Sequence, residues 1–393
     1  MRSEFILVAA LVMMYATNMH NYAFEEGLWP VKPVFIYLMT VAAVLWLVSR
    51  QEAPLFFEML PQSVAFWIVI FIVLLIVAFI ASSQSALVFR LTIGYVKFAF
   101  LFGLMTILMH KGSWRHSAEY ALLCAALIAV VWYGIEIMNY ADQVNGRARG
   151  AYKNPNYAGR MLIFCMLVSV TVVPRHLRFP FVLVCGLGVL FTFSRSSILL
   201  WGASVGGLFL VGMFGRISML KVGLGAVCAV LAGAVVLGAA GGIIENSFLV
   251  EYLDKGTRER VGIDGSTFSD WSFDGRVRAA ALAFDRFASS PWVGYGLGTT
   301  REWSMAIAPH NTYLMVGAEG GLLALLVYLA FIYVCWRSAD DLGKIIVGLY
   351  AVSGVITHNN LDQLPNVIFL AYAARRGLQF RPHQLRPRTQ LPA

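Results

Sequence analysis

Long apolar runs separated by short polar stretches dominate the chain of 393 residues. Residues 64–80 and 222–240 form two such runs, and both are continuous. The strands of a membrane barrel would instead be short, with alternating apolar and polar residues. About 20 consecutive apolar residues are long enough for a helix to cross the hydrocarbon core of a bilayer. The pattern therefore predicts an all-α, polytopic membrane protein.

We expect about twelve transmembrane helices, because that many apolar runs have a length near the thickness of the bilayer. They lie at residues 4–20, 31–49, 62–82, 87–109, 117–140, 157–173, 179–193, 196–214, 219–243, 310–335, 342–358 and 363–376. The boundary between the seventh and eighth spans is the hardest to place. Residues 1–393 are expected to form one membrane domain, with a larger extracytoplasmic loop at 244–309, containing short helices, between predicted helices 9 and 10.

Composition supports the bilayer as the solvent of this chain. Hydrophobic residues make up 59% and charged residues 13%, whereas a soluble domain has about 25% charged residues. The net charge of +9 would indicate nucleic acid on a soluble protein, but no soluble domain carries a basic stripe here. We therefore expect membrane lipids and no nucleic acid as partners. The five cysteines lie in apolar runs without metal-ligand spacing, so no metal site is predicted.

Loop charge predicts the orientation, because short cytoplasmic loops are enriched in Lys and Arg. The tail from Arg375 to Arg388 is rich in arginine, which places it in the cytoplasm, and an even number of spans places the N-terminus there too. Other cations gather on the opposite side, in residues 141–160 and 244–309 and at Arg195. Long loops cross regardless of charge, yet a basic cluster at an outer membrane face also fits an anionic ligand such as phosphate.

The first candidate segment reads RARGAYKNPNYAGR, from Arg147 to Arg160. Asn156 is a plausible N-cap of the following span, and a helix N-terminus attracts anions. The surrounding cations are Arg147, Arg149, Lys153 and Arg160. The alternative is a capped loop with solvated charges.

The second segment is FSRSS, where Arg195 sits between two spans close to the outer face. An arginine at this depth is costly unless it faces a cavity or a partner, so we favour function over snorkelling. The fourth span carries two further cations, Arg90 and Lys97, seven residues apart and therefore on one helix face. They either line a groove for a ligand or pair with Glu136.

The 244–309 loop contains a predicted amphipathic helix from Asp274 to Ala288. Its apolar side would hold Val277, Ala281, Leu282 and Phe284, with Asp285 and Arg286 opposite, and Asp274 would be the N-cap. Arg276 and Arg278 lie in its first turns. The GYGLG sequence that follows resembles a phosphate loop superficially, but it does not follow a strand.

His310 lies at the outer entrance of the tenth predicted span, followed by Asn311. Histidine can accept a proton near neutral pH, which is the task of activating a hydroxyl. A lone histidine is more often structural, but here it accompanies several arginines at one membrane face. Such a site suits a lipid-linked phosphate donor, because guanidinium groups can neutralise a pyrophosphate leaving group.

At these residues the chain resembles the O-antigen ligase and polymerase superfamily of bacterial envelope enzymes. The resemblance rests on RARGAYKNPNYAG, FSRSS, DGRVRAALAFDRFASSPWVGYGLG and PHNTYLMVGAEGGLLALL, in that order, between Arg147 and Leu325. The sequence HNNLDQLP, at 358–365, also looks familial. The earlier helices match in hydropathy alone.

The resemblance implies an inverting glycosyltransferase of the bacterial inner membrane that needs no metal and no cofactor. The donor would be a glycan on undecaprenyl pyrophosphate, and the acceptor a sugar hydroxyl of lipid A–core at the periplasmic face. Arg195 and Arg276 would bind the pyrophosphate, and His310 would orient or deprotonate the acceptor hydroxyl, although an acidic residue could also take the proton. Arg147, Arg149 and Arg278 are further candidates.

Two rivals stay open. A polymerase of the same superfamily would use a second lipid-linked glycan as its acceptor; the 244–309 loop is short for two large glycan sites, which favours the ligase. A lipid-linked glycan transporter would place polar residues at mid-membrane, often on broken helices. Lys97 is the one strong candidate for such a position.

Overall fold

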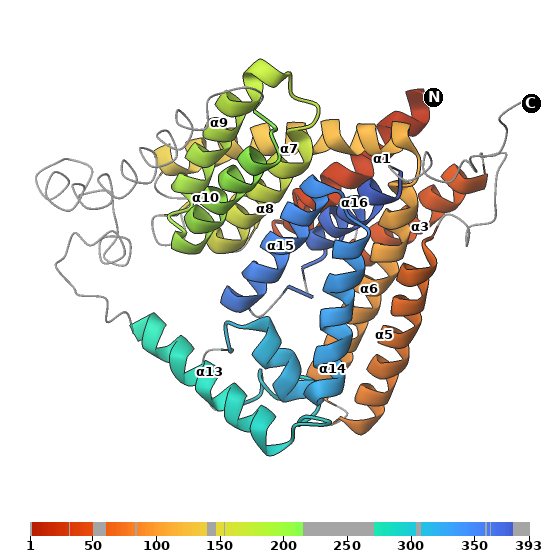
Figure 1. Ribbon diagram of the computed structural model, residues 1–393, viewed down its shortest axis with the longest axis vertical. Coiled ribbons are helices and arrows are strands. Elements are labelled where there is room, and N and C mark those ends of the chain that lie inside the picture. Colours follow the sequence, from red (N-terminus) through yellow and green to blue (C-terminus); the bar gives the residue numbers. More distant parts are fainter. Residues whose placement is uncertain are drawn as a thin grey trace, which may run out of the picture.

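The computed structural model describes residues 2–30, 32–49, 60–82, 85–139, 147–152, 154–214, 271–303, 308–357, 360–361 and 363–379. Within these ranges the chain is 78% helical and contains no strand, which confirms the all-α prediction (Figure 1). The helices are α1 (Arg2–Ala16), α2 (Met19–Glu25), α3 (Pro33–Ser49), α5 (Gln62–Ala81), α6 (Ala86–Leu108), α7 (Gly112–Met138), α8 (Pro155–Ser169), η2 (Arg175–Leu177), α9 (Arg178–Phe191), α10 (Arg195–Leu210), α13 (Trp271–Ser289), α14 (Thr312–Arg337), α15 (Asp341–Ile356) and α16 (Pro365–Gln379).

Every predicted span inside the described ranges contains a helix, while the span predicted at 219–243 lies outside them. Four described helices, α5, α6, α7 and α14, are long and apolar enough to cross a membrane by length and composition. Several others are shorter: α8 has 15 residues and α9 has 14, and a helix of that length spans roughly 21–23 Å against a hydrocarbon core of about 30 Å. The chain is thus a helical, membrane-type protein, and the number of twelve crossings stays a prediction.

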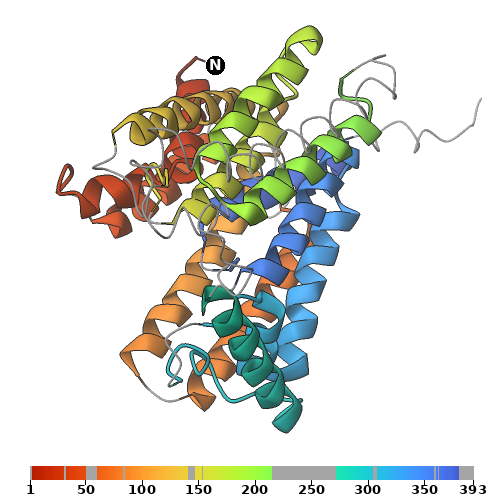
Figure 2. The ribbon, with the colours of Figure 1, turned by 90° about the vertical axis from the view of Figure 1, so that its left-hand side faces the viewer.

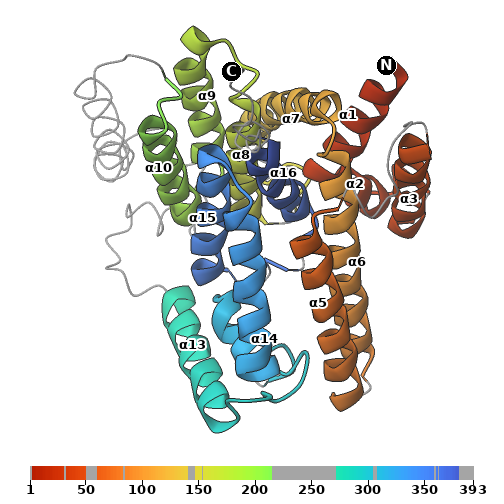
Figure 3. The same ribbon diagram turned by 45° about the vertical axis from the view of Figure 1, so that its right-hand side comes forward.

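The helices differ sharply in how much of their surface faces outward. Helix α5 is the most exposed of the four long apolar helices and presents large apolar side chains such as Phe66 and Ile80 outward. In contrast, every residue of α8 except Asn156 is buried, and so is α16 from Pro365 to Arg375. Figure 3 shows α5 and α6 side by side, with α8 and α16 surrounded by other helices. Apolar surface on α5 is therefore available to lipid, whereas α8 and α16 form the interior.

An aromatic cluster joins α5, α6 and α14. The ring of Trp67 lies 4.3 Å from that of Phe331, between centroids, and Phe102 lies 5.0 Å from Phe331. The indole Nε1 of Trp67 also donates to the carbonyl of Val327 at 3.0 Å. Aromatic pairs add stability beyond the area that they bury. This cluster therefore packs the long helices α5, α6 and α14 against one another.

Helix α14 is broken at Gly321, whose φ of 65° and ψ of −164° are not helical. Figure 1 shows its shorter first part set at an angle to the longer second part. Helix α13 packs against the first part, through Ala279 and Ala283 on Ala318. Figures 1 and 2 both show α13 at the end of the molecule opposite α7. The predicted tenth span is thus two helical pieces.

Several helices begin at a polar residue that the sequence places there. The side chains of Ser85, Asn154, Ser194, Asn311 and Asp340 each accept from a backbone N–H in the first turn of α6, α8, α10, α14 and α15. Such caps satisfy amide groups that the helix cannot bond internally. The N-cap of α8 is therefore Asn154, and the expectation that Asn156 caps this helix is wrong, because the helix begins at Pro155.

Candidate functional site

Arg147 joins two of the segments that the sequence singled out. Its Nε donates to the carbonyl of Thr192 at 2.8 Å, and its Nη2 donates to Oδ1 of Asn156 at 2.7 Å. The side chain is 6% exposed. The backbone N–H of Ala148 adds a bond to the carbonyl of Phe191 at 3.1 Å. Arg147 therefore fastens the loop before α8 to the turn between α9 and α10, and it is buried within the protein.

The FSRSS turn presents Arg195 at the start of α10. Phe193 has a φ of 44°, which side chains rarely adopt, and Ser194 caps the helix by accepting from the N–H of Ser197 at 3.3 Å. Arg195 is the first helical residue and is exposed. Ser197 in turn donates to the carbonyl of Asn156 at 3.2 Å. The N-termini of α8 and α10 thus lie against each other, with a guanidinium beside them.

His310 lies near the C-terminal end of α15. Two residues later, the hydroxyl of Thr312 donates to the carbonyl of Thr357 at 2.6 Å, and Tyr313 donates to the carbonyl of Ala351 at 2.8 Å. Asn311 caps α14 through the N–H of Leu314 at 3.1 Å, so its side chain has a structural task. His310 itself is partly exposed, just before a third helix N-terminus.

Arg160 connects α8 to the segment that follows α15. Its Nη1 donates to Oδ1 of Asn360 at 3.1 Å, and the amide of Asn360 donates to the carbonyl of Tyr350 at 3.1 Å. Asn366 then donates to the carbonyl of Asn360 at 2.9 Å. Arg160 is 6% exposed, so the expectation that it surrounds the N-terminus of α8 with the loop cations is wrong. It points into the protein because the second turn of α8 is enclosed by α15 and α16.

Arg149 contributes its backbone to the same region. The carboxylate of Glu136 accepts from the N–H groups of Arg149 at 2.7 Å and Gly150 at 2.9 Å. Nearby, burial raises the pKa of the Tyr152 hydroxyl well above its usual range, and this hydroxyl donates to the carbonyl of Ala16. Glu136 was not expected to have this role. Lys153 lies outside the described residues.

Helix α13 confirms the predicted amphipathic helix but corrects its limits. It begins at Trp271, so Asp274 is not its N-cap. Its buried side holds Ala279 and Ala283, while Val277 and Phe284 are 52% and 56% exposed. Val277, Ala281 and Phe284 therefore share one exposed face, and the face that packs against the protein is a different one.

Arg276 and Arg278 are both exposed, but they lie on different sides of α13. Arg276 precedes Ala279 by three residues and Ala283 by seven, so the helical repeat places it on the side that packs against the protein. Arg278 lies away from that side. Of the two, Arg276 is the better placed to act together with residues of other helices.

The GYGLG turn packs against the break in α14. Gly294, Gly296 and Gly298 have φ values of 67°, 95° and 84°, and a Cβ on Gly294 would lie 2.5 Å from the carbonyl carbon of Glu319. The N–H groups of Tyr295 and Gly296 bond to the carbonyls of Ala318 and Glu319, both at 2.9 Å. These glycines serve a tight turn and do not form a phosphate loop.

Glu319 holds the end of this turn from inside the protein. It is 5% exposed, and its Oε1 accepts from the hydroxyl of Thr300 at 2.5 Å. The sequence places Glu319 in EGG, close to the histidine motif, but no pattern in the sequence predicts its contact with Thr300.

Arg90 and Lys97 stand apart from the residues above. The Nε of Arg90, which is exposed, donates to the carbonyl of Ala86 at 3.3 Å, within its own helix. The Nζ of Lys97 lies 5.0 Å from the ring centroid of Tyr37 on α3. The carboxylate of Glu136, their alternative partner, accepts from the backbone amides of Arg149 and Gly150. Whether they line a donor groove stays a prediction.

Positive potential gathers where α8 and α10 begin. Their N-termini lie against each other, and each carries a partial positive charge. Arg195 adds a full charge there. Across the described part of the chain, no three His, Cys, Asp or Glu side chains gather to hold a metal ion. The described groups at this place include guanidinium, backbone amide and hydroxyl donors.

Comparison with known proteins adds no assignment. No family model matches the chain, and no curated protein matches it.

Proposed function

We propose that the protein is an O-antigen ligase, a glycosyltransferase that moves a glycan from undecaprenyl pyrophosphate to lipid A–core. One observation carries the proposal: the separate segments behind the resemblance are neighbours in space. Arg147 ties the first segment to FSRSS, Arg160 ties α8 to Asn360, and Thr312 ties the histidine motif to Thr357. Segments that lie far apart in the sequence are expected to be adjacent in the structure when they form one site.

The chemistry follows from charge development. As the acceptor oxygen attacks the anomeric carbon, the bond from that carbon to the pyrophosphate oxygen breaks, and negative charge grows on the leaving group. Arg195, with the N-termini of α8 and α10, supports our assignment of the pyrophosphate to this place, because prearranged positive charge lowers the barrier. Arg276, on the inward side of α13, is proposed as the second guanidinium.

His310 is proposed to take the proton of the acceptor hydroxyl. Attack from the face opposite the pyrophosphate inverts the anomeric carbon and releases undecaprenyl pyrophosphate. A general base must lie where the acceptor can reach it, and the partial exposure of His310 at the start of α14 supports this role. Arg147 and Asn311 are better described as positioning residues, because their side chains bond within the protein.

The proposed setting is the bacterial inner membrane, with both termini in the cytoplasm and the site on the periplasmic side. A polar cluster near the start of α7 supports this orientation. Lys111 lies 3.3 Å from the carboxylate of Glu4, and Arg375 donates to the carbonyl of Thr106 at 3.2 Å. These residues belong to the segments whose positive charge predicts a cytoplasmic location.

A transporter is the second candidate, because the break in α14 resembles the discontinuous helices of that class. In transporters, the carbonyls freed at such a break bind ions or substrate. Here the carbonyls of Ala318 and Glu319 accept from the protein's own turn, at Tyr295 and Gly296. The break therefore accommodates the GYGLG turn, which favours the glycosyltransferase.

The test is transfer by the purified protein from undecaprenyl pyrophosphate-linked glycan to lipid A–core, with EDTA present. We expect transfer by the wild type and its loss in Arg195→Ala, Arg276→Ala and His310→Ala. Arg278→Ala is the matched control, because it removes the same charge from the other side of α13, and it should retain transfer. Longer lipid-linked chains in place of transfer to lipid A–core would make the protein a polymerase. Accumulation of substrate in proteoliposomes without a covalent product would favour the transporter.

A further inference from the structure

Arg160 is a buried cation whose partners in the described structure are neutral. Its hydrogen-bond acceptor is Asn360, and its guanidinium lies 5.3 Å from the ring centroid of Tyr157. The Nε has no hydrogen-bond partner. No carboxylate among the described residues forms an ion pair with it. A buried charge is strongly unfavourable unless it is paired or fully hydrogen-bonded, so this environment lacks an anion.

Three tyrosine hydroxyls around Arg160 also lack partners. Tyr157, Tyr328 and Tyr350 all lie near enough to interact electrostatically with the guanidinium, and each hydroxyl is buried without a hydrogen bond. The hydroxyl of Tyr328 lies close to Tyr350 and to Asn360, but none of the three tyrosine hydroxyls reaches hydrogen-bond geometry. Most buried polar groups in proteins are bonded. The charged Nε of Arg160 and these neighbouring hydroxyls, all without a hydrogen-bond partner, fit a group with several acceptor oxygens.

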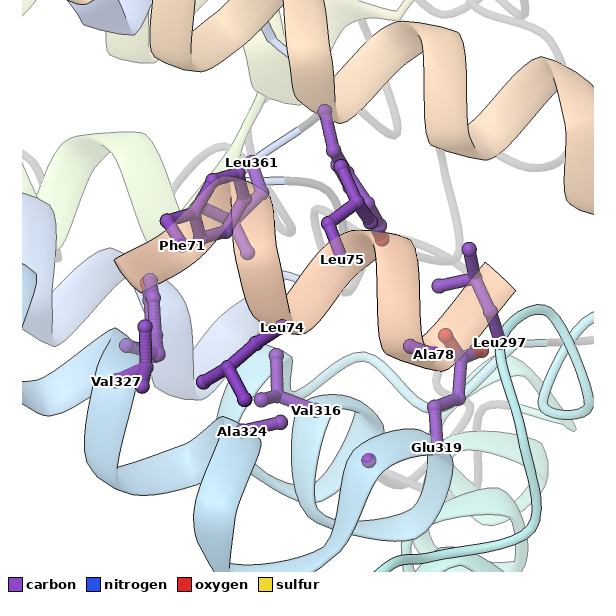
Figure 4. A pocket seen from close by; sticks show the side chains of 13 residues that line it. Phe71, Leu74, Leu75, Ala78, Leu297, Val316, Glu319, Ala324, Val327 and Leu361 are labelled. Carbon is purple, nitrogen blue, oxygen red and sulfur yellow. The ribbon is translucent and has the colours of Figure 1, made fainter. Parts of the chain in front are cut away.

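An apolar cavity of about 90 Å³ adjoins this cluster. Tyr328 and Leu361, the neighbour of Asn360, belong to its wall, so the cavity and the Arg160 cluster share a boundary. Figure 4 shows side chains from α5 and α14 lining the cavity, among them Leu74, Val316 and Val327. The lining is apolar except at Glu319 and the tyrosines. A space of this character suits a hydrocarbon chain whose polar end reaches Arg160.

We propose that Arg160, with the hydroxyls of Tyr157, Tyr328 and Tyr350, forms an interior subsite for a phosphate group carried on an apolar chain. The inference rests on the proposed function and extends its donor site, because a polyprenyl pyrophosphate has both parts. Arg160 lies in the second turn of α8, and the N-terminus of this helix is where the pyrophosphate is proposed to bind beside Arg195. The phosphate oxygens accept from the guanidinium and the hydroxyls, and the adjoining chain enters the cavity between α5 and α14. Tyr328 lines the cavity and neighbours Arg160, so it lies between the two parts.

The experiment measures binding to the purified full-length protein in detergent, without any transfer reaction. Farnesyl pyrophosphate is the amphiphilic probe, and inorganic phosphate and pyrophosphate are the free anions. We expect Arg160→Gln to weaken binding of farnesyl pyrophosphate about tenfold or more, the effect of losing one charge-assisted hydrogen bond. Tyr328→Phe removes a hydroxyl and keeps the ring, so it should weaken binding by a smaller factor.

Two variants serve as matched controls. Arg375→Gln removes another buried arginine, which is 7% exposed and also has an orphaned nitrogen. Tyr133→Phe removes a buried hydroxyl that already donates to the carbonyl of Ala158. Neither should change the affinity for the probe. If Arg160→Gln does not fold, Tyr328→Phe against Tyr133→Phe decides the same question.

Each outcome has a distinct meaning. Tight binding of farnesyl pyrophosphate that depends on Arg160, together with much weaker binding of free pyrophosphate, supports the subsite for a chain-bearing phosphate. Free pyrophosphate that binds as tightly as farnesyl pyrophosphate, and depends on Arg160 to the same degree, would assign the cluster to a free anion and overturn the lipid source. Affinity that is unchanged in both Arg160→Gln and Tyr328→Phe, or no binding at all, would overturn the subsite. Because binding is measured without glycan, a failed transfer assay would leave this result intact.

Discussion

Replacing Arg147 tests whether it is a structural tie or a substrate ligand. In Arg147→Ala, the carbonyl of Thr192 and the side chain of Asn156 lose bonds of 2.8 Å and 2.7 Å to a charged donor. Each such bond contributes about 1.5–3 kcal/mol, so the two together contribute roughly 3–6 kcal/mol. Thr192 is fully buried, so water cannot easily replace the lost donor.

The assay is equilibrium unfolding in mixed micelles, followed by helical circular dichroism. Arg149→Ala is the matched control: it lies two residues away in the same loop, and Glu136 binds its backbone rather than its side chain. The control should unfold within about 0.5 kcal/mol of the wild type, as ordinary surface substitutions do. Wild-type stability in Arg147→Ala, or an equal loss in Arg149→Ala, would refute the reasoning and return Arg147 to the list of substrate ligands.

Two further predictions follow from the fold. Gly294→Ala should destabilise the protein markedly and lower transfer, because Gly294 has a φ of 67° and a Cβ there would lie 2.5 Å from the carbonyl carbon of Glu319. The control is Gly206→Ala, in open space on α10, which should be neutral or stabilising. Equal thermal stability of the two variants would contradict this prediction. Burial, and secondarily Arg375, lowers the pKa of His110 below its usual 6.5. The contribution of His110 to stability is therefore full above pH 6.5 and is lost as the pH falls through the lowered pKa. His110→Gln should flatten the plot of unfolding free energy against pH below pH 6.5. An unchanged plot would count against this prediction.

The sequence alone was enough to predict the helical membrane class and the position of most helices. Long apolar runs can satisfy their backbone in lipid only as helices, and Asn, Ser and Asp residues mark where several helices begin. The helix at 271–289 was also recognisable from its periodicity. Each of these features depends on residues that are close together in the sequence, so a local sequence pattern is enough to predict it.

Tertiary structure alone decided which sides of these helices are inside. In a water-soluble protein, polar residues mark the outer face, but in a membrane both the lipid-facing and the buried faces are apolar. Hydropathy therefore could not distinguish the exposed α5 from the buried α8 and α16, nor identify the buried side of α13. The same limitation misplaced Arg160, whose environment depends on Asn360, 200 residues later in the chain. Contacts at such separations arise from the packing of whole helices, which no local pattern encodes.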